Sequence, residues 1–236
     1  MASAPTVPAA VEPSNRAIAP AWHTVLLILV LIGFSLLGAH SGQRMMRHGR
    51  IVPYAFTTAF EWLVVAFIAW GVKRRGLRLA DILGDFSPRP AAILRDVGIA
   101  AGFLLVSQVV LGVIGHLLKS APNQAIRALM PQNPLEMVAW VGLSLTAGIC
   151  EEIMFRGYFL RQFSAWTGTV AGGIILQGIF FGLDHGYQGW KLMTVIAVYG
   201  TMFGLLARWR RSLRPGMFAH FTQDAAGGLL ARYLMR

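Results

Sequence analysis

The stretch WHTVLLILVLIGFSLLGA, residues 22–39, contains no Asp, Glu, Lys or Arg in 18 consecutive positions. A helix of this length approaches the roughly 20 apolar residues that span the hydrocarbon core of a bilayer. Across the 236-residue chain, 56% of residues are hydrophobic and 13% are charged, whereas about 25% are charged in a typical soluble domain. The sequence therefore predicts an all-α, polytopic bundle of transmembrane helices and excludes an ordinary soluble domain.

Six further apolar stretches follow the first, so we expect about seven spans in all. The candidate spans cover residues 22–39, 53–72, 97–118, 135–163, 169–185, 192–207 and 215–234. Residues 1–21 precede them and are rich in proline and alanine. Such a composition cannot bury a core, and it predicts a disordered tail.

The formal net charge of the chain is +11, which would indicate a nucleic-acid partner if the basic residues formed one patch. They are dispersed between the apolar stretches instead, so we expect a lipid bilayer as a partner and no nucleic acid. Lys and Arg are in excess in the N-terminal tail and in the connections after the second, fourth and sixth spans. The positive-inside rule therefore predicts a multi-pass protein of the cell membrane, with its N-terminus in the cytoplasm. The many Arg and few Lys fit a bacterial inner-membrane protein.

Ionisable side chains inside the apolar stretches are the main functional signal of the sequence. A charged group in hydrocarbon costs from about 2.5 to more than 10 kcal/mol, so such groups must face the bundle interior, a partner or water. They are concentrated in the C-terminal part of the chain, at Glu151, Glu152, Asp184, His185, His220 and Asp224.

The segment TAGICEEIMFRGYF, residues 146–159, holds two adjacent acids. On a helix, Glu152 and Arg156 share a face four residues apart, in the order that favours an ion pair. Glu151 points about 100° away and has no such local partner. One hypothesis is that Arg156 holds Glu152 as a structural acid, while Glu151 projects into a cavity as a working base. The alternative is a salt-bridge cluster that locks two helices together.

Two later segments each place a histidine four residues from a second side chain. In GIFFGLDHG, residues 178–186, the Phe181 ring can pack beside the His185 imidazole, although His185 could equally be a buried core histidine. In RPGMFAHFTQDAAGG, residues 214–228, His220 and Asp224 share a helix face, which could also be a pair that only stabilises the helix.

The depths of these residues limit how they can meet. At about 1.5 Å per residue, Glu151 and His185 lie within roughly one helical turn of each other when measured from the turn at residues 164–168. His220 follows Pro215 too closely to reach that depth, so we expect the arginine-rich segment before it to dip inward. We also expect the cavity to open toward that segment.

Three motifs, E-E-x-x-x-R, F-x-x-x-H and H-x-x-x-N or D, occur in this order as EEIMFR (151–156), FGLDH (181–185) and HFTQD (220–224). In these motifs the chain resembles the CAAX prenyl protease and bacteriocin-processing family of intramembrane proteases. The resemblance implies an intramembrane endopeptidase with its catalytic core at 135–236 and accessory transmembrane helices at 22–134. The third motif ends in Asp224, where the prenyl-protein proteases usually have Asn and many bacterial relatives have Asp.

The chemistry of the residues agrees with what the resemblance implies. Glu151 and His185 can activate a water. His220 can donate a hydrogen bond to an oxyanion, and Asp224 can orient that donor or, if it is protonated, donate as well. Glu152, Arg156 and Phe181 would support them. Glu151, His185 and His220 could also form a zinc site; we favour a glutamate-dependent enzyme without a metal or other cofactor. The expected substrate is a membrane-associated or lipid-anchored polypeptide.

Other functions use the same or nearby residues. Cys150 could act as a nucleophile with a histidine, although a small packed side chain is favoured. Glu61, in the second span, could relay protons, although a structural role is favoured. The chain as a whole could instead be a non-catalytic immunity or scaffold protein of the same fold, or a proton-coupled transporter.

Overall fold

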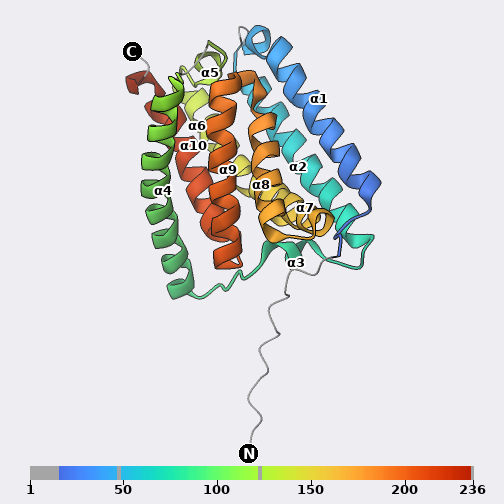
Figure 1. Cartoon of the computed structure of the whole chain (residues 1–236). Helices are drawn as coiled ribbons and strands as arrows, with labels where there is room; N and C mark the ends of the chain where they lie inside the picture. Colours follow the sequence, from blue (N-terminus) through green and yellow to red (C-terminus); the bar gives the residue numbers. More distant parts are fainter. Residues whose placement is uncertain (1–15, 47–48, 122–123, 235–236) are drawn as a thin grey trace, which may run out of the picture.

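The computed structural model describes residues 16–46, 49–121 and 124–234. These residues form helices and no β-strand, apart from an isolated bridge between Gly84 and Ser212. The helices shown in Figure 1 are, in chain order, α1 (Ala21–Met46), α2 (Ile51–Lys73), α3 (Leu79–Leu83), α4 (Pro90–Leu118), α5 (Gln124–Leu129), α6 (Pro134–Glu151), η1 (Glu152–Phe159), α7 (Leu160–Thr167), α8 (Val170–Asp184), η2 (Gly186–Gln188), α9 (Trp190–Arg210) and α10 (Arg214–Leu234).

Each of the seven expected spans corresponds to a helix or a run of helices, so the helical membrane bundle is confirmed. The fourth span is the longest, because α6, η1 and α7 run on from Pro134 to Thr167. Within the described residues, five helices are long and apolar enough to cross a membrane: α1, α2, α4, the α6–α7 run and α9. The 15-residue α8 is shorter, and α10 is more polar, so the count of seven depends on these two.

The chain before α1 is anchored to the bundle. Residues 1–15 of the expected tail lie outside the described residues, but Ile18 and Ala19 are buried. Their backbone N–H groups donate to Gln162 Oε1 at 3.0 and 3.2 Å, and Gln162 Nε2 donates to Ala19 O at 3.1 Å. The boundary of the disordered tail at residue 21 is therefore wrong, because a buried amide 143 residues away holds this segment.

The turn between α9 and α10 lies inside the bundle, as the depth argument predicts. Leu213 is buried, and its N–H donates to Leu83 O at 3.0 Å. A Cβ atom added at Gly157 of η1 would lie 3.2 Å from Leu213 Cδ1. The glycine therefore lets η1 and this turn approach each other closely. The buried Asp96 of α4 binds Arg214 (Nε to Oδ2, 2.7 Å) and neutralises part of the arginine-rich turn. The start of α10 therefore lies inside the bundle, closer to the depth of the first motif.

Glycines allow the motif helices to pack closely. A Cβ atom at Gly148 of α6 would lie 2.9 Å from the backbone N of Phe221 in α10. A Cβ atom at Gly200 of α9 would lie 2.8 Å from the Phe181 ring, and one at Gly204 would lie 2.5 Å from Gln177 Nε2, both in α8. The G-x-x-x-G spacing of α9 is thus used for packing within the chain.

Candidate functional site

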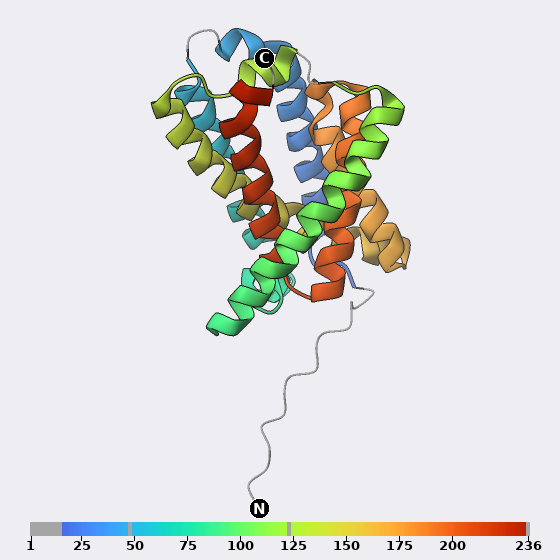
Figure 2. The same cartoon turned by 90° about the vertical axis from the view of Figure 1, so that its left-hand side faces the viewer.

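The three motif helices line one large cavity inside the bundle. Its volume is about 1120 Å³, and Glu151, Phe181, His185, His220 and Asp224 all lie in its lining. Their side chains come from α6, from α8 and the residue after it, and from α10; α6 packs against α10 (Figures 1 and 2), and the ring of Phe181 lies 5.8 Å from that of His220, centre to centre. The structure thus brings the proposed base, both histidines and the last acid of the third motif to one place.

The cavity extends away from the arginine-rich turn. Its lining continues from the motif residues to Lys119 and Ser120 at the end of α4 and to Met130 just after α5. Figure 1 shows α5 at the end of the bundle opposite to α3. The expectation that the cavity opens toward the arginine-rich segment is therefore wrong, because that turn packs against α3 and η1 and closes this end.

Glu152 and Arg156 form the predicted ion pair. Arg156 Nη1 lies 3.0 Å from Glu152 Oε1, and neither side chain is exposed to solvent. The guanidinium also lies between two aromatic rings, with Cζ 4.3 Å from the centre of Phe181 and 4.7 Å from that of Phe203. This segment is a π-helix rather than an α-helix. Such wide turns often occur at functional sites.

His220 lies among three carboxylates. Its Nδ1 is 3.1 Å from Glu152 Oε1, and its Nε2 is 3.7 Å from Glu151 Oε2 and 3.5 Å from Asp224 Oδ2. The Glu152 contact joins residues 68 positions apart and links the first motif to the third. A ring in this position can donate from both nitrogens when it carries two protons.

His185 is held in one tautomer by a backbone bond. It follows the last residue of α8, and its Nδ1–H donates to Phe181 O at 2.9 Å. In the neutral ring the other nitrogen, Nε2, is then a hydrogen-bond acceptor. The Phe181 ring lies 5.0 Å from the imidazole, centre to centre, as the four-residue spacing suggests. His185 can thus accept a proton or hydrogen bond from a water in the cavity.

Glu151 is the acid of the first motif that has no ion pair with an arginine. Its side chain is 13% exposed, and Oε2 has no hydrogen-bond partner among the described residues. Asp224 is more open, with 36% of its side chain exposed, and its backbone carbonyl accepts from Trp140 Nε1 at 2.8 Å. Glu151 is therefore free to bind a water, whereas Oε1 of Glu152 is engaged by both Arg156 and His220.

The possible metal ligands expected from the sequence are Glu151, His185 and His220. Within the described residues, no three His, Cys, Asp or Glu side chains are arranged to hold a metal ion. His220 Nδ1 is directed to Glu152, and His185 Nδ1 to a backbone carbonyl.

Two residues near the site were not assigned to it from the sequence. Glu61 of α2 lines the large cavity, and Phe203 of α9 covers Arg156. The sequence signal that could have found Glu61 was its position inside an apolar stretch. No such signal marks Phe203, because aromatic residues are common in apolar helices. Cys150 is buried in the main hydrophobic cluster, as expected for a packed side chain.

The comparison with known families supports the resemblance. Residues 133–226 match the family model described as Type II CAAX prenyl endopeptidase Rce1-like. No curated protein and no solved structure matches the chain. The matched segment runs from the N-cap of α6 to just beyond Asp224, so it contains all three motifs and the helices that carry them. Residues 133–226 of this multi-pass membrane protein are thus similar to the Rce1-like family of CAAX proteases.

Proposed function

We propose that the chain is an intramembrane endopeptidase that hydrolyses a peptide bond with a water activated by Glu151 and His185. The observation that supports this proposal most is the hydrogen bonding of Glu151 and His185 in the cavity. Glu151 Oε2 has no hydrogen-bond partner within the described residues, and the Nδ1 bond of His185 leaves Nε2 as an acceptor. Both groups line the same cavity as His220 and Asp224.

The reaction can be written with side chains of the chain alone. His185 accepts a hydrogen bond from the water and orients it toward the substrate. The water oxygen then adds to the carbonyl carbon of the scissile bond while Glu151 accepts a proton from the water. The resulting oxyanion accepts a hydrogen bond from His220 Nε2–H. The C–N bond then breaks as Glu151 returns the proton to the amine, which leaves a carboxylic acid and a free amine.

Glu152 and Asp224 have indirect roles in this scheme. Glu152 accepts from His220 Nδ1–H and fixes the ring, and Arg156 holds Glu152 in turn. Asp224, 3.5 Å from Nε2, balances the charge of a doubly protonated His220. An ionised Asp cannot donate to the oxyanion as an Asn would, so His220 is the main donor in this chain.

The substrate is a membrane-associated or lipid-anchored polypeptide. The cavity lies between helices whose outer faces expose large apolar side chains, such as Leu105 and Val109 of α4. A peptide bond close to the membrane surface can enter it without crossing the whole bilayer. The lipid anchor of such a substrate need not be a prenyl group.

The test compares cells that carry the wild-type chain with cells that carry Glu151→Gln. We expect at least one membrane or secreted polypeptide to show a new terminus only with the wild type, measured by mass spectrometry of peptide termini. If no terminus differs and both chains rescue a deletion phenotype equally, the chain acts without catalysis, as a scaffold or immunity protein would.

We propose that the chain lies in the cell membrane with its N-terminus in the cytoplasm, as the charge distribution favours. The large cavity then extends toward the non-cytoplasmic side, since it reaches α5 and not α3. The only cysteine, Cys150, is buried, so single exposed cysteines can report the topology. A membrane-impermeant maleimide should label Ala121→Cys in intact spheroplasts and Arg89→Cys only after lysis. The reverse pattern would contradict this orientation.

A further inference from the structure

Glu61 is a buried acid outside the three motifs and outside the segment matched by the family. It lies in α2, and only 7% of the residue is exposed. Within the described residues, Glu61 forms no ion pair, and its buried Oε2 atom has no hydrogen-bond partner. Because a buried polar group without a partner is costly, the structural role favoured from the sequence does not account for it.

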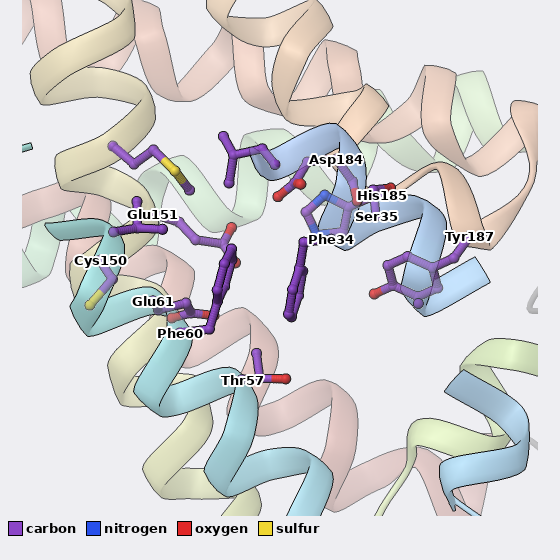
Figure 3. A pocket seen from close by; sticks show the side chains of 14 residues that line it. Phe34, Ser35, Thr57, Phe60, Glu61, Cys150, Glu151, Asp184, His185 and Tyr187 are labelled. Carbon is purple, nitrogen blue, oxygen red and sulfur yellow. Dashed lines mark hydrogen bonds between the residues drawn. The ribbon is translucent and has the colours of Figure 1, made fainter. Parts of the chain in front are cut away.

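Glu61 lines a second, smaller pocket next to the large cavity. The pocket has a volume of about 130 Å³ and lies between α1, α2, α6 and the end of α8. Figure 3 shows Glu61 and Glu151 on one side of this pocket and Asp184 and His185 across from them. Since one water occupies about 30 Å³ in the liquid, the pocket has room for a small number of waters.

The two cavities meet at the catalytic pair. Glu61, Glu151 and His185 line both, whereas His220 and Asp224 line only the large one and Asp184 only the small one. A polypeptide that occupies the large cavity against His220 would therefore leave the small pocket on the other side of Glu151 unfilled. The small pocket is thus placed to keep water beside the base while substrate is bound.

Three buried carboxylate oxygens in this pocket lack hydrogen-bond partners within the described residues: Oε2 of Glu61, Oε2 of Glu151 and Oδ1 of Asp184. Buried waters typically make about three hydrogen bonds to polar groups that are otherwise unsatisfied. Neutral Glu61 can donate to the water or to Glu151, and ionised Glu61 can accept from the water. These carboxylates, on a lining that is otherwise largely apolar, are therefore the groups to which a water in the pocket can bind.

We propose that the small pocket holds the hydrolytic water and that Glu61 is a positioning residue that keeps this water against Glu151 while substrate fills the large cavity. The inference rests on the proposed endopeptidase activity and assigns a role in it to the helices before residue 133. Each turnover consumes one water, so the pocket also supplies the next one. Glu61 itself exchanges no proton with the substrate and forms no bond to it.

The test uses Glu61→Leu and Glu61→Gln, with protein reconstituted in liposomes and an internally quenched peptide that spans the cleavage site found in the terminus comparison. We expect Glu61→Leu to lower kcat about 10–100-fold, the cost of misplacing a reactant, with little change in KM. Glu61→Gln can still hydrogen-bond the water, so it should retain most of the activity.

Thermal unfolding separates this role from a structural one. Glu61→Leu removes an unpaired buried carboxyl, so its Tm should equal or exceed that of the wild type. Glu136→Leu is the matched control: this buried acid has a 3.5 Å ion pair with Arg50 and lies outside both cavities. Its loss should lower Tm and leave kcat unchanged. Radiolytic labelling of Met154, which lines the small pocket, should fall in Glu61→Leu because the nearby water is lost.

The outcomes distinguish the two proposals. Without cleavage by the wild type, the endopeptidase proposal fails. If the wild type cleaves and Glu61→Leu has the same kcat, only the role of Glu61 is overturned. The role is also overturned if Glu61→Gln is as inactive as Glu61→Leu, or if Glu61→Leu loses Tm and activity together.

Discussion

Glu151→Gln is expected to lower the rate of peptide hydrolysis by about 10²–10⁴-fold, the range for losing a general base, while Tm stays close to the wild-type value. The amide has nearly the shape of the carboxylate, but it cannot take a proton from water. Stability should change little, because Glu151 Oε2 has no hydrogen-bond partner within the described residues and lies 3.7 Å from His220 Nε2.

The measurement is single-turnover cleavage of the quenched peptide by protein in liposomes, with unfolding followed on the same preparations. Glu136→Gln, in the same helix but outside the cavity, is the control and should cleave at the wild-type rate. If Glu151→Gln cleaves within about tenfold of the wild type, Glu151 is not the general base.

The fold could be predicted because its helices follow from local composition. The span expected at 53–72 corresponds to α2, Ile51–Lys73, and the one at 192–207 to α9, Trp190–Arg210. The burial of Ile18 and Ala19 could not be predicted, since it depends on the side chain of Gln162. Apolar stretches thus determine where helices form, whereas long-range contacts determine where a bundle begins.

The candidate site could be predicted in part, for the same reason. The ion pair of Glu152 and Arg156 is a local contact, and it is present. The bond between Glu152 and His220 joins two helices, and only their packing places these atoms 3.1 Å apart.

The direction of the cavity was missed because it depends on which end of the bundle is closed. Leu213 N–H donates to Leu83 O at the end of α3, and Ser212 Oγ donates to Asp85 O at 2.6 Å in the segment after it. The positions of these residues in the sequence do not reveal that contact. The proximity of Glu61 to Glu151 could not be predicted from the sequence either, since it depends on the packing of α2 against α6.

Among the charged pairs of the site, the pair of Glu152 and Arg156 should be the most costly to break, because neither side chain is exposed. Glu152→Gln is expected to lower the free energy of unfolding by about 3–5 kcal/mol, the range for removing one partner of a buried pair. Arg156 would keep its charge with no exposed surface, between the rings of Phe181 and Phe203. Activity should fall as well, but less than in Glu151→Gln, because the Gln oxygen can still accept from His220 Nδ1–H.

Unfolding in mixed micelles with increasing SDS can measure this loss, and a double-mutant cycle can assign it. Arg156→Met alone should also destabilise the chain, whereas Glu152→Gln combined with Arg156→Met should lose less than the sum of the two, because no buried charge is left unpaired. Glu136→Gln gives the comparison: its partner Arg50 is 17% exposed, so the arginine keeps contact with water when the carboxylate is lost, and the loss should be smaller than in Glu152→Gln. Equal losses in Glu152→Gln and Glu136→Gln, or strictly additive effects in the cycle, would show that Glu152 is not held as a structural acid. The two adjacent glutamates would then not be divided into a working base and a structural acid.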